Sequence, residues 1–415
     1  MRQRQVINMN NFPITIFKLS NGLRCVHCLR RGEVEYCGVA VNAGSRDELT
    51  PDRFGLAHFV EHTIFKGTTH RRSWHIINRM EAVGGELNAY TTKEETYVYS
   101  TFPRGNLRRA AELIADLVKR SAFPHAEIDR ERDVVADEIN TYSDIPSDGI
   151  YDDFEDMIFA GSALGHNILG TVESLAGFTT DVCREYLDRF YTPGQMVFFY
   201  SGPTRPAQVE KIVAEYFGSL SLPDVERDRK QPDIVSRFDN VKEISSHQSH
   251  VVMGARIGGL FAPDRYAMAL LTNILGGPGM NSLLNVELRE RRGLVYTIDA
   301  SASHLTDTGL FTVYFGCDHD DASRCRRLVA NTIDRIAQGA INERRLSQAK
   351  RQYAGQLVIA SANAEQTALS QGRSMPYFDT VAPLSVTLDR IAAVTTDEIT
   401  AAAQRLTELS VLTLR

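Results

Sequence analysis

The most informative stretch of this 415-residue chain reads Leu56-Ala57-His58-Phe59-Val60-Glu61-His62-Thr63-Ile64-Phe65. Its apolar residues recur at helical spacing and predict a helix over residues 54–65. Residues four apart on a helix lie about 40° apart around its axis, so His58 and His62 share one face. Two imidazoles one turn apart can both bind a single zinc ion. The spacing makes both histidines candidate metal ligands.

Glu61 lies on the same predicted helix, three residues after His58. There its carboxylate can contact a metal-bound water without being a ligand itself. A general base at this position takes the proton as the water attacks a carbonyl. The order His-x-x-Glu-His inverts the more common zinc protease motif. Glu61 is therefore a candidate catalytic base.

A histidine pair without a metal is the alternative, because histidines four apart also arise by chance on amphipathic helices. The residues on both sides of the motif are apolar, which predicts that the helix is buried. Two buried imidazoles and a carboxylate without partners would cost several kcal/mol in desolvation. We therefore favour a metal site.

A catalytic zinc needs a third protein ligand. The best candidate stretch is Asp129-Arg130-Glu131-Arg132-Asp133-Val134-Val135-Ala136-Asp137-Glu138-Ile139. On a helix predicted over residues 126–142, Glu131 and Glu138 are two turns apart and share a face with Val135. Taken alone, the stretch favours a solvated acidic face over a ligand.

The first half of the chain alternates strand and helix patterns. An Asn21-Gly22 turn between alternating runs predicts a hairpin. Further segments follow in order: a strand at 39–41, a helix at 74–83, a glycine stop at Gly84-Gly85, a strand over 87–102 and helices at 107–120 and 126–142.

The second half repeats this order, with a strand at 250–257, a helix at 266–275, a stop at Gly276-Gly277-Pro278-Gly279, strands at 295–303 and 309–315, and helices at 322–338 and 342–360. We therefore expect an α+β fold of two similar domains, each a mostly antiparallel sheet covered by helices. A proline-containing charged segment at 221–235 is the expected linker. It separates a metal-binding domain at 1–220 from a domain at 236–415 that has no metal motif.

Composition narrows the class of protein. Hydrophobic residues make up 43% of the chain and charged residues 24%, as in ordinary globular proteins. A net charge of −6 argues against a nucleic-acid partner. No apolar run is long enough to span a membrane, and no apolar segment follows the charged N-terminus. With six cysteines, we expect reduced thiols and a cytoplasmic location, unless a targeting segment was removed.

Two minor motifs carry less weight. Cys25-Val26-His27-Cys28 lies on a predicted strand, where residues three apart point to opposite faces. This favours ordinary strand cysteines over a zinc ribbon. The segment Gly276-Gly277-Pro278-Gly279 lacks the Lys-Ser/Thr ending of a phosphate loop.

Taken together, these motifs resemble the pitrilysin-type zinc metallopeptidases, or inverzincins, which include mitochondrial processing peptidase and insulin-degrading enzyme. The resemblance implies that Glu138 is the third zinc ligand, beside His58 and His62. It also implies that Glu131 is a carboxylate that contacts the zinc ligands without binding zinc itself. It also covers Gly84-Gly85-Glu86-Leu87-Asn88-Ala89-Tyr90-Thr91-Thr92-Lys93-Glu94-Glu95-Thr96, which is similar to the family's active-site strand. Asn88 and Ala89 would then contact the substrate backbone as an added β-strand.

In the second half, Leu288-Arg289-Glu290-Arg291-Arg292-Gly293-Leu294-Val295-Tyr296 resembles the family's arginine–tyrosine segment. The resemblance implies that Arg289 and Tyr296 hold the substrate and the oxyanion. In processing peptidases the glycine-rich loop faces the substrate, so the loop at Gly276 has this role as an alternative to a structural turn. The resemblance covers about residues 17–373. One departure is Val98, which stands where members often have an aromatic residue.

These expectations describe a zinc-dependent endopeptidase with one zinc per chain that hydrolyses peptides or small unfolded proteins in a closed chamber. The chain is half the size of the long single-chain members, which implies a homodimer or a heterodimer with a related subunit. The partner would then supply the arginine–tyrosine pair. The alternatives are a non-catalytic structural or partner subunit, or a substrate-binding partner of another catalytic chain. Such members lose the motif, whereas His58, Glu61, His62 and Glu138 are all present here.

Overall fold

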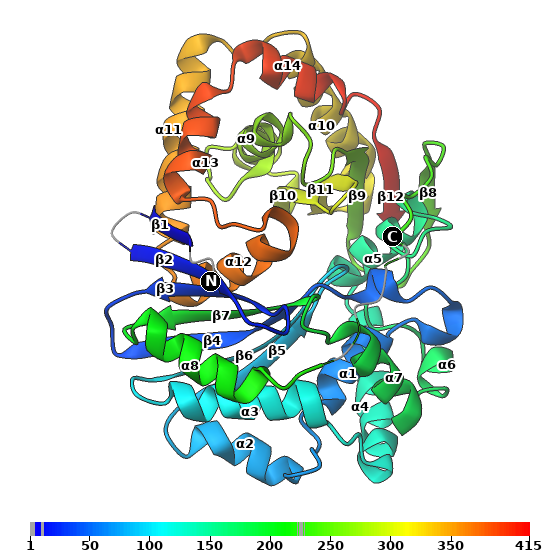
Figure 1. Ribbon diagram of the computed structural model, residues 1–415. Coiled ribbons are helices and arrows are strands. Elements are labelled where there is room, and N and C mark those ends of the chain that lie inside the picture. The colour runs from blue at the N-terminus through cyan, green and yellow to red at the C-terminus, as the bar shows by residue number, and fades with distance from the viewer. Residues whose placement is uncertain (1–4, 10–11, 222, 224–226, 228) are drawn as a thin grey trace. The chain divides into compact units, whose positions relative to one another are not determined.

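The computed structural model describes the chain except residues 1–4, 10–11, 222, 224–226 and 228 (Figure 1). The chain forms two compact units, each with one sheet and covering helices. The first unit contains Met1–Asn140, His166–Arg229 and Ser361–Ser385. The second contains Thr141–Gly165, Lys230–Ala360 and Val386–Arg415. The expected α+β fold of two similar domains is confirmed.

The first unit is built on a seven-stranded sheet in the order β1-β2-β3-β7-β4-β6-β5. Its strands are β1 (Gln5–Met9), β2 (Phe12–Lys18), β3 (Arg24–Leu29), β4 (Val34–Val41), β5 (Glu86–Thr91), β6 (Thr96–Pro103) and β7 (Met196–Gly202). All neighbouring strands are antiparallel except β3 and β7. In this strand order β5 is the last strand, so it lies at one edge of the sheet and one side of its backbone is unpaired within the sheet.

Helices cover both faces of this sheet (Figure 1). One face packs against α1 (Leu56–Thr63), α2 (Ser73–Glu81), α3 (Leu107–Arg120), α7 (Thr180–Phe190) and α8 (Pro206–Phe217). The other face is covered by α12 (Ala364–Phe378), whose Leu369 and Met375 join a buried cluster with Val197 and Phe199. A helix encoded late in the chain thus completes the core of the first unit.

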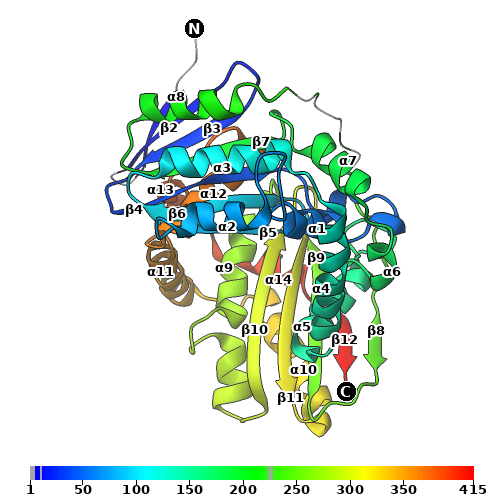
Figure 2. The ribbon, with the colours of Figure 1, turned by 90° about the horizontal axis from the view of Figure 1, so that it is seen from below.

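The second unit has a five-stranded sheet in the order β10-β11-β9-β12-β8 (Figure 2). The strands are β8 (Asp239–Lys242), β9 (Ser249–Ile257), β10 (Val295–His304), β11 (Gly309–Cys317) and β12 (Ser410–Leu414). The larger core lies between one face and helices that include α9 (Arg265–Gly276), α10 (Ala322–Ala337) and α14 (Thr396–Gln404). The remaining helices of the chain are α4 (His125–Ser143), α5 (Pro146–Ile158), α6 (Val172–Leu175), α11 (Glu343–Ala360) and α13 (Leu384–Ala393).

The opposite face of the second sheet buries Ile150, Phe154 and Ile158 of α5, beside Val252 and Leu412. The two units therefore differ from the contiguous domains expected at 1–220 and 236–415, because residues 141–165 and 361–385 are exchanged. The physical reason is burial, since the apolar side chains of α5 lie against the second sheet and those of α12 lie against the first sheet. One of the passages of the chain between the units follows Arg229, inside the expected linker 221–235. Several residues of this linker lie outside the described ones.

A second difference concerns the strand expected over residues 87–102, which is two strands. The turn between β5 and β6 is held locally, because Thr92 Oγ1 accepts hydrogen bonds from the backbone amides of Glu94 and Glu95. By contrast, the expected helix 107–120 matches α3. Cys25 and Cys28 lie in clusters on opposite faces of the sheet, as the strand geometry predicted.

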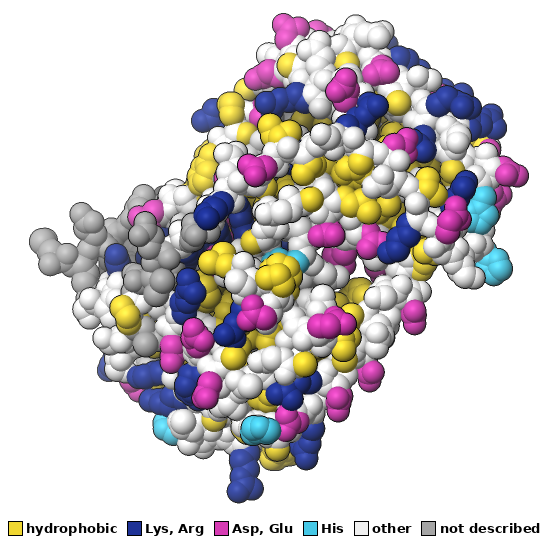
Figure 3. All heavy atoms as spheres, turned by 90° about the vertical axis from the view of Figure 1, so that its right-hand side faces the viewer, with side chains coloured by type: hydrophobic (Ala, Val, Ile, Leu, Met, Phe, Trp, Pro, Cys, Tyr) yellow, Lys and Arg dark blue, Asp and Glu magenta, His cyan; other side chains and the backbone are white. Residues whose placement is uncertain are grey.

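Two surface properties bear on possible partners. On the face drawn in Figure 3, basic and acidic side chains are interspersed rather than gathered into one basic stripe. Among the described residues, no helix combines the length and the apolar character needed to cross a membrane.

Candidate metal centre

Helix α1 carries the His-x-x-Glu-His motif and begins at an unusual cap. Both oxygens of the buried Glu48 carboxylate accept hydrogen bonds from the first amides of the helix, Gly55 N at 2.7 Å and Ala57 N at 2.6 Å. Burial raises the pKa of Glu48 well above its ordinary value, and the hydrogen bonds from these two amides act in the opposite direction. His166 Nε2 lies 2.8 Å from the same carboxylate.

Gly55 is required at this entry to the helix. Its φ is +92°, in the left-handed region, and an added Cβ would lie 2.5 Å from the carbonyl oxygen of Leu169. Any other residue would therefore be strained and would push the helix away from its neighbour. Glu48 and Gly55 together fix the position from which the motif starts.

The two histidines project from one face of α1, as their spacing predicted. Their ring centroids are 4.4 Å apart, with His58 buried and His62 partly buried. Burial, reinforced by the neighbouring charge of His62, lowers the pKa of His58 to about 3. His58 is therefore neutral at ordinary pH, which is the form that can bind a metal.

Helix α4 brings Glu138 to the same place. One of its carboxylate oxygens lies 3.5 Å from His62 Nε2 and 3.9 Å from His58 Nε2. One potential ligand atom from each of these three residues lies within 4.8 Å of the others. Two imidazoles and one carboxylate are a donor set that zinc accepts in catalytic sites. The residues present therefore fit a zinc ion.

Glu131 contacts the opposite nitrogen of His62. Its carboxylate accepts a hydrogen bond of 2.9 Å from His62 Nδ1, and its second oxygen lies 2.7 Å from Lys66 Nζ. Because a carboxylate can only accept, Nδ1 of His62 carries a proton, and Nε2 is the ring nitrogen that faces Glu138. Burial opposes ionisation of Glu131, but the hydrogen bonds from His62 and Lys66 leave its pKa below the ordinary value.

Glu61 lies beside this cluster and is held from the sheet. Its Oε2 accepts a hydrogen bond of 2.8 Å from Thr91 Oγ1 on β5. Burial raises the pKa of Glu61; the hydrogen bond from Thr91 and the charge of His62 oppose this effect, and the charge of Glu138 adds to it. A raised pKa makes the carboxylate a better proton acceptor.

The residues implied for substrate contact lie on β5. Asn88 is exposed and Ala89 is partly buried, on the strand that forms the edge of the sheet. Arg289 and Tyr296 belong to the second unit. Arg289 is exposed, and Tyr296 is 56% exposed and donates a hydrogen bond of 3.0 Å to Asp318. The roles of these four residues remain predictions from the resemblance.

Sequence reasoning missed Glu48, Lys66, Thr91 and His166. Two of them had a usable signal: Lys66 is four residues after His62, and Thr91 is two residues after Ala89, on the same face of a strand. Glu48 and His166 had none, because they meet α1 only through the tertiary fold. The sequence motifs thus pointed to the residues around the candidate metal position and to Glu131, but not to the other residues that contact them.

Two family models match the chain. The insulinase model of peptidase family M16 matches residues 31–172, which include all the candidate zinc ligands. The model described as the peptidase M16 inactive domain matches residues 177–353. This division agrees with a metal motif in the first half alone.

Bacterial relatives match over most of their length. An uncharacterized zinc protease of Streptomyces coelicolor is 31% identical over 377 residues, which cover 88% of this chain and 81% of that protein. One from Mycobacterium tuberculosis is 32% identical, with coverages of 89% and 85%. The uncharacterized zinc protease YmxG of Bacillus subtilis is 28% identical, with 89% of each chain covered.

Solved structures show the same fold. A protease from Helicobacter pylori superposes with a TM-score of 0.88 over all of both chains, at 20% identity. A peptidase M16 inactive domain from Pseudomonas fluorescens gives a TM-score of 0.88 over 97% of both chains, at 17% identity. With the family models and the bacterial relatives, these matches establish that the chain belongs to the pitrilysin-type zinc protease family, peptidase family M16.

Proposed function

We propose that the protein is a zinc-dependent endopeptidase that hydrolyses peptides or small unfolded proteins. The observation that carries the proposal is the convergence of His58, His62 and Glu138, with the Glu61 carboxylate beside them. The three residues would hold one zinc ion per chain. When bound, zinc supplies Lewis acidity that polarises a carbonyl and makes water more acidic.

In this proposal Glu61 moves the proton. Its carboxylate accepts a proton from the attacking water and delivers it to the leaving amine. The hydroxyl of Thr91 holds one oxygen of that carboxylate, leaving the other available. Glu131 and Lys66 keep His62 in the tautomer whose Nε2 faces the metal position.

The edge strand β5 supports an extended peptide as the substrate. Its unpaired side can form backbone hydrogen bonds with an added strand, which recognises the peptide backbone rather than a particular sequence. Asn88 and Ala89 would contact such a strand, and Thr91 of the same strand reaches Glu61. A peptide bound there would therefore run past the proposed base.

The proposal includes a second subunit, identical or related. In it, Arg289 and Tyr296 of the partner would bind substrate and stabilise the developing oxyanion. The support is the family resemblance, together with the location of the candidate zinc ligands in the first unit and of Arg289 and Tyr296 in the second. The two subunits would enclose the substrate in a chamber.

The test compares wild type with Glu61→Gln in zinc content and turnover of a quenched peptide. We expect about one zinc in both proteins and a loss of turnover of about 100-fold or more in the variant, because general-base catalysis contributes about 10²–10⁴-fold. Wild-type protein that binds zinc but cleaves none of a varied set of unfolded substrates would favour the alternative, a non-catalytic partner subunit. Turnover by Glu61→Gln equal to wild type would show that the base is another residue.

A further inference from the structure

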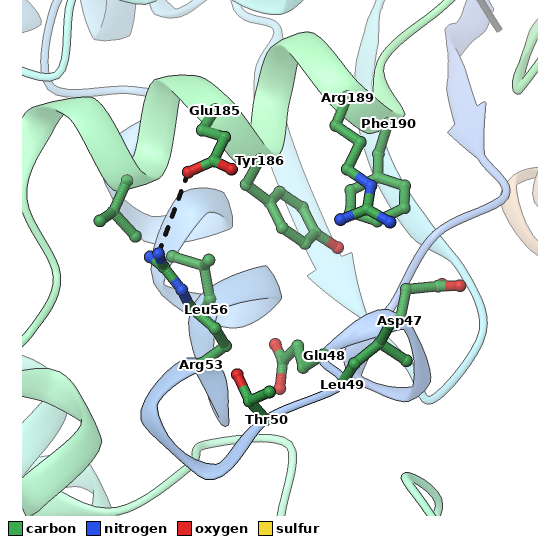
Figure 4. A pocket seen from close by; sticks show the side chains of 11 residues that line it. Asp47, Glu48, Leu49, Thr50, Arg53, Leu56, Glu185, Tyr186, Arg189 and Phe190 are labelled. Atoms are coloured by element: carbon green, nitrogen blue, oxygen red, sulfur yellow. Dashed lines mark ion pairs between the residues drawn. The ribbon is translucent and has the colours of Figure 1, made fainter. Parts of the chain in front are cut away.

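A pocket of about 250 Å³ lies in the first unit, and neither His58 nor His62 is among the residues that line it (Figure 4). It is formed by α7 and by the loop that contains the 3-10 turns Ser45–Asp47 and Pro51–Arg53. Much of its wall is apolar, from Leu49, Leu56, Val182 and Phe190. A space of this size suits a small organic molecule.

A buried hydroxyl group is left without a partner in this wall. Tyr186 of α7 is 4% exposed, and its hydroxyl has no hydrogen-bond partner among the described residues. Figure 4 shows the ring directed from the helix toward the loop, with the hydroxyl at the pocket. Burial of an unpaired hydroxyl is unfavourable, so a ligand atom that paired with it would remove a cost already present.

Two of the three acidic groups of the pocket, Asp47 and Glu48, are already engaged, whereas the third, Glu185, is exposed and lies 3.9 Å from Arg53. Asp47 lies 2.7 Å from the Arg229 guanidinium and accepts a hydrogen bond from Gly44 N. Glu48 accepts the amides at the start of α1. Neither carboxylate therefore needs a cation from a ligand.

The two arginines of the pocket differ. Arg189 is exposed and lies over the ring of Phe190, and no ion pair of its guanidinium occurs among the described residues. Arg53 lies 3.5 Å from Asp52 and 3.9 Å from Glu185, so it already has two acidic neighbours, both exposed. The pocket thus combines an apolar wall, one unpaired buried hydroxyl and one exposed arginine, Arg189, that has no ion pair among the described residues.

We propose that this pocket binds a small amphipathic carboxylate. Its anionic group pairs with Arg189, its body lies against the apolar wall, and a polar atom at its inner end hydrogen-bonds to Tyr186. The same chemistry is offered by a free aryl carboxylate and by the C-terminal residue of a peptide. A bidentate arginine contact favours a carboxylate over a neutral amide.

Occupancy of the pocket bears on the metal centre through α1. Leu56 in the wall is the first residue of that helix, and Glu48 caps it. A ligand there would therefore stabilise the helix that carries His58, Glu61 and His62. This consequence rests on the proposed function, whereas binding itself does not.

Titration calorimetry tests the binding with 3-(4-hydroxyphenyl)propionate. We expect a dissociation constant on the order of 1 mM or tighter for a ligand of this size. Binding should weaken at least about fivefold for 3-phenylpropionate, which lacks the inner hydroxyl, and for the corresponding amide, which lacks the charge. N-acetyl-tyrosine mimics the C-terminal residue of a peptide. If it binds more tightly than 3-(4-hydroxyphenyl)propionate, a peptide C-terminus is the better match, and if it binds more weakly, a free aryl carboxylate is.

Variants complete the test. Arg189→Gln should weaken binding at least about fivefold, because the charged contact is lost. Tyr186→Phe should bind both phenyl ligands equally and keep or raise the melting temperature, since only an unpaired hydroxyl is removed. Arg104→Gln, an exposed arginine of the same unit outside the pocket, should bind as wild type does.

Absence of binding to folded wild-type protein at millimolar concentrations would overturn the proposal. Binding that both pocket variants leave unchanged would also overturn it. Zinc content and peptide turnover are measured on the same preparation. Failure of the pocket can therefore be separated from failure of the peptidase assignment.

Discussion

At the scale of single residues, the two glutamates that contact His62 are expected to differ in effect. Glu138→Gln should largely empty the metal site, because it removes one of three ligands. Glu131→Gln should lower zinc affinity or turnover by about 10–100-fold, since it only orients His62. Zinc content and turnover of the two variants provide the comparison, and the reverse order would exchange the assigned roles.

Thr91 is expected to act through Glu61. Thr91→Val removes the hydroxyl that contacts the carboxylate but keeps the shape of the side chain, so it should lower kcat by about 10-fold, the loss expected for one hydrogen bond, with KM little changed. Thr91→Ser restores a hydroxyl and should recover most of the rate. An equal loss in both variants would indicate a packing role for Thr91 instead.

Residue patterns predicted part of the site, for a physical reason. Helical spacing alone places His58, Glu61 and His62 on one face of a helix, so these side chains could be selected without a fold. Spacing also puts Glu131 and Glu138 on one face, but their roles were inferred from the family resemblance. Neither the cap from Glu48 nor the hydrogen bond from Thr91 follows from spacing. Each requires the loop before α1 and the edge of the sheet to be in place.

At the scale of elements, α12 is expected to stabilise the first unit although it follows most of the second unit in sequence. Leu369→Ala should cost about 2–5 kcal/mol, the usual range for a buried leucine. Ile359→Ala on α11, where the side chain is 76% exposed, is the matched control and should change stability little. Chemical unfolding followed by circular dichroism measures both variants, and equal stabilities would mean that the face of α12 is not buried.

The helices show which features could be predicted from the sequence and which could not. Helix α3 was predicted to the residue because its apolar stripe is strong and it ends in a change of pattern. The exchange of α5 and α12 was not predicted, because an apolar face shows that a helix is covered but not which sheet covers it. Similarly, the turn at Thr92 depends on hydrogen bonds from one hydroxyl, which hydrophobic periodicity does not show.

At the scale of the whole molecule, a shared active site makes a complementation prediction. Glu61→Gln and Tyr296→Phe should each be nearly inactive, because one lacks the base and the other lacks a group that stabilises the oxyanion. After subunit exchange, one mixed arrangement pairs an intact Glu61 with an intact Tyr296. Activity should then rise above that of either parent.

The control for this experiment is mass measurement of the exchanged species. If mixed dimers form and no activity returns, the sites are built within single chains and the shared-site proposal is wrong. A protein that is monomeric at assay concentration and fully active would contradict it equally. In either case the zinc ligands of the first unit would be unaffected.

Because α12 follows most of the second unit in the sequence but packs on the first sheet, it also determines when the first unit can finish folding during synthesis on the ribosome. Until residue 378 has left the exit tunnel, the nascent chain cannot cover the face of the first sheet that α12 covers in the finished protein. The exposed face, with Val26, Val197 and Phe199, is then a natural contact for a chaperone. Complete folding of the metal-binding unit is therefore expected only late in synthesis, after most of the second unit has been translated.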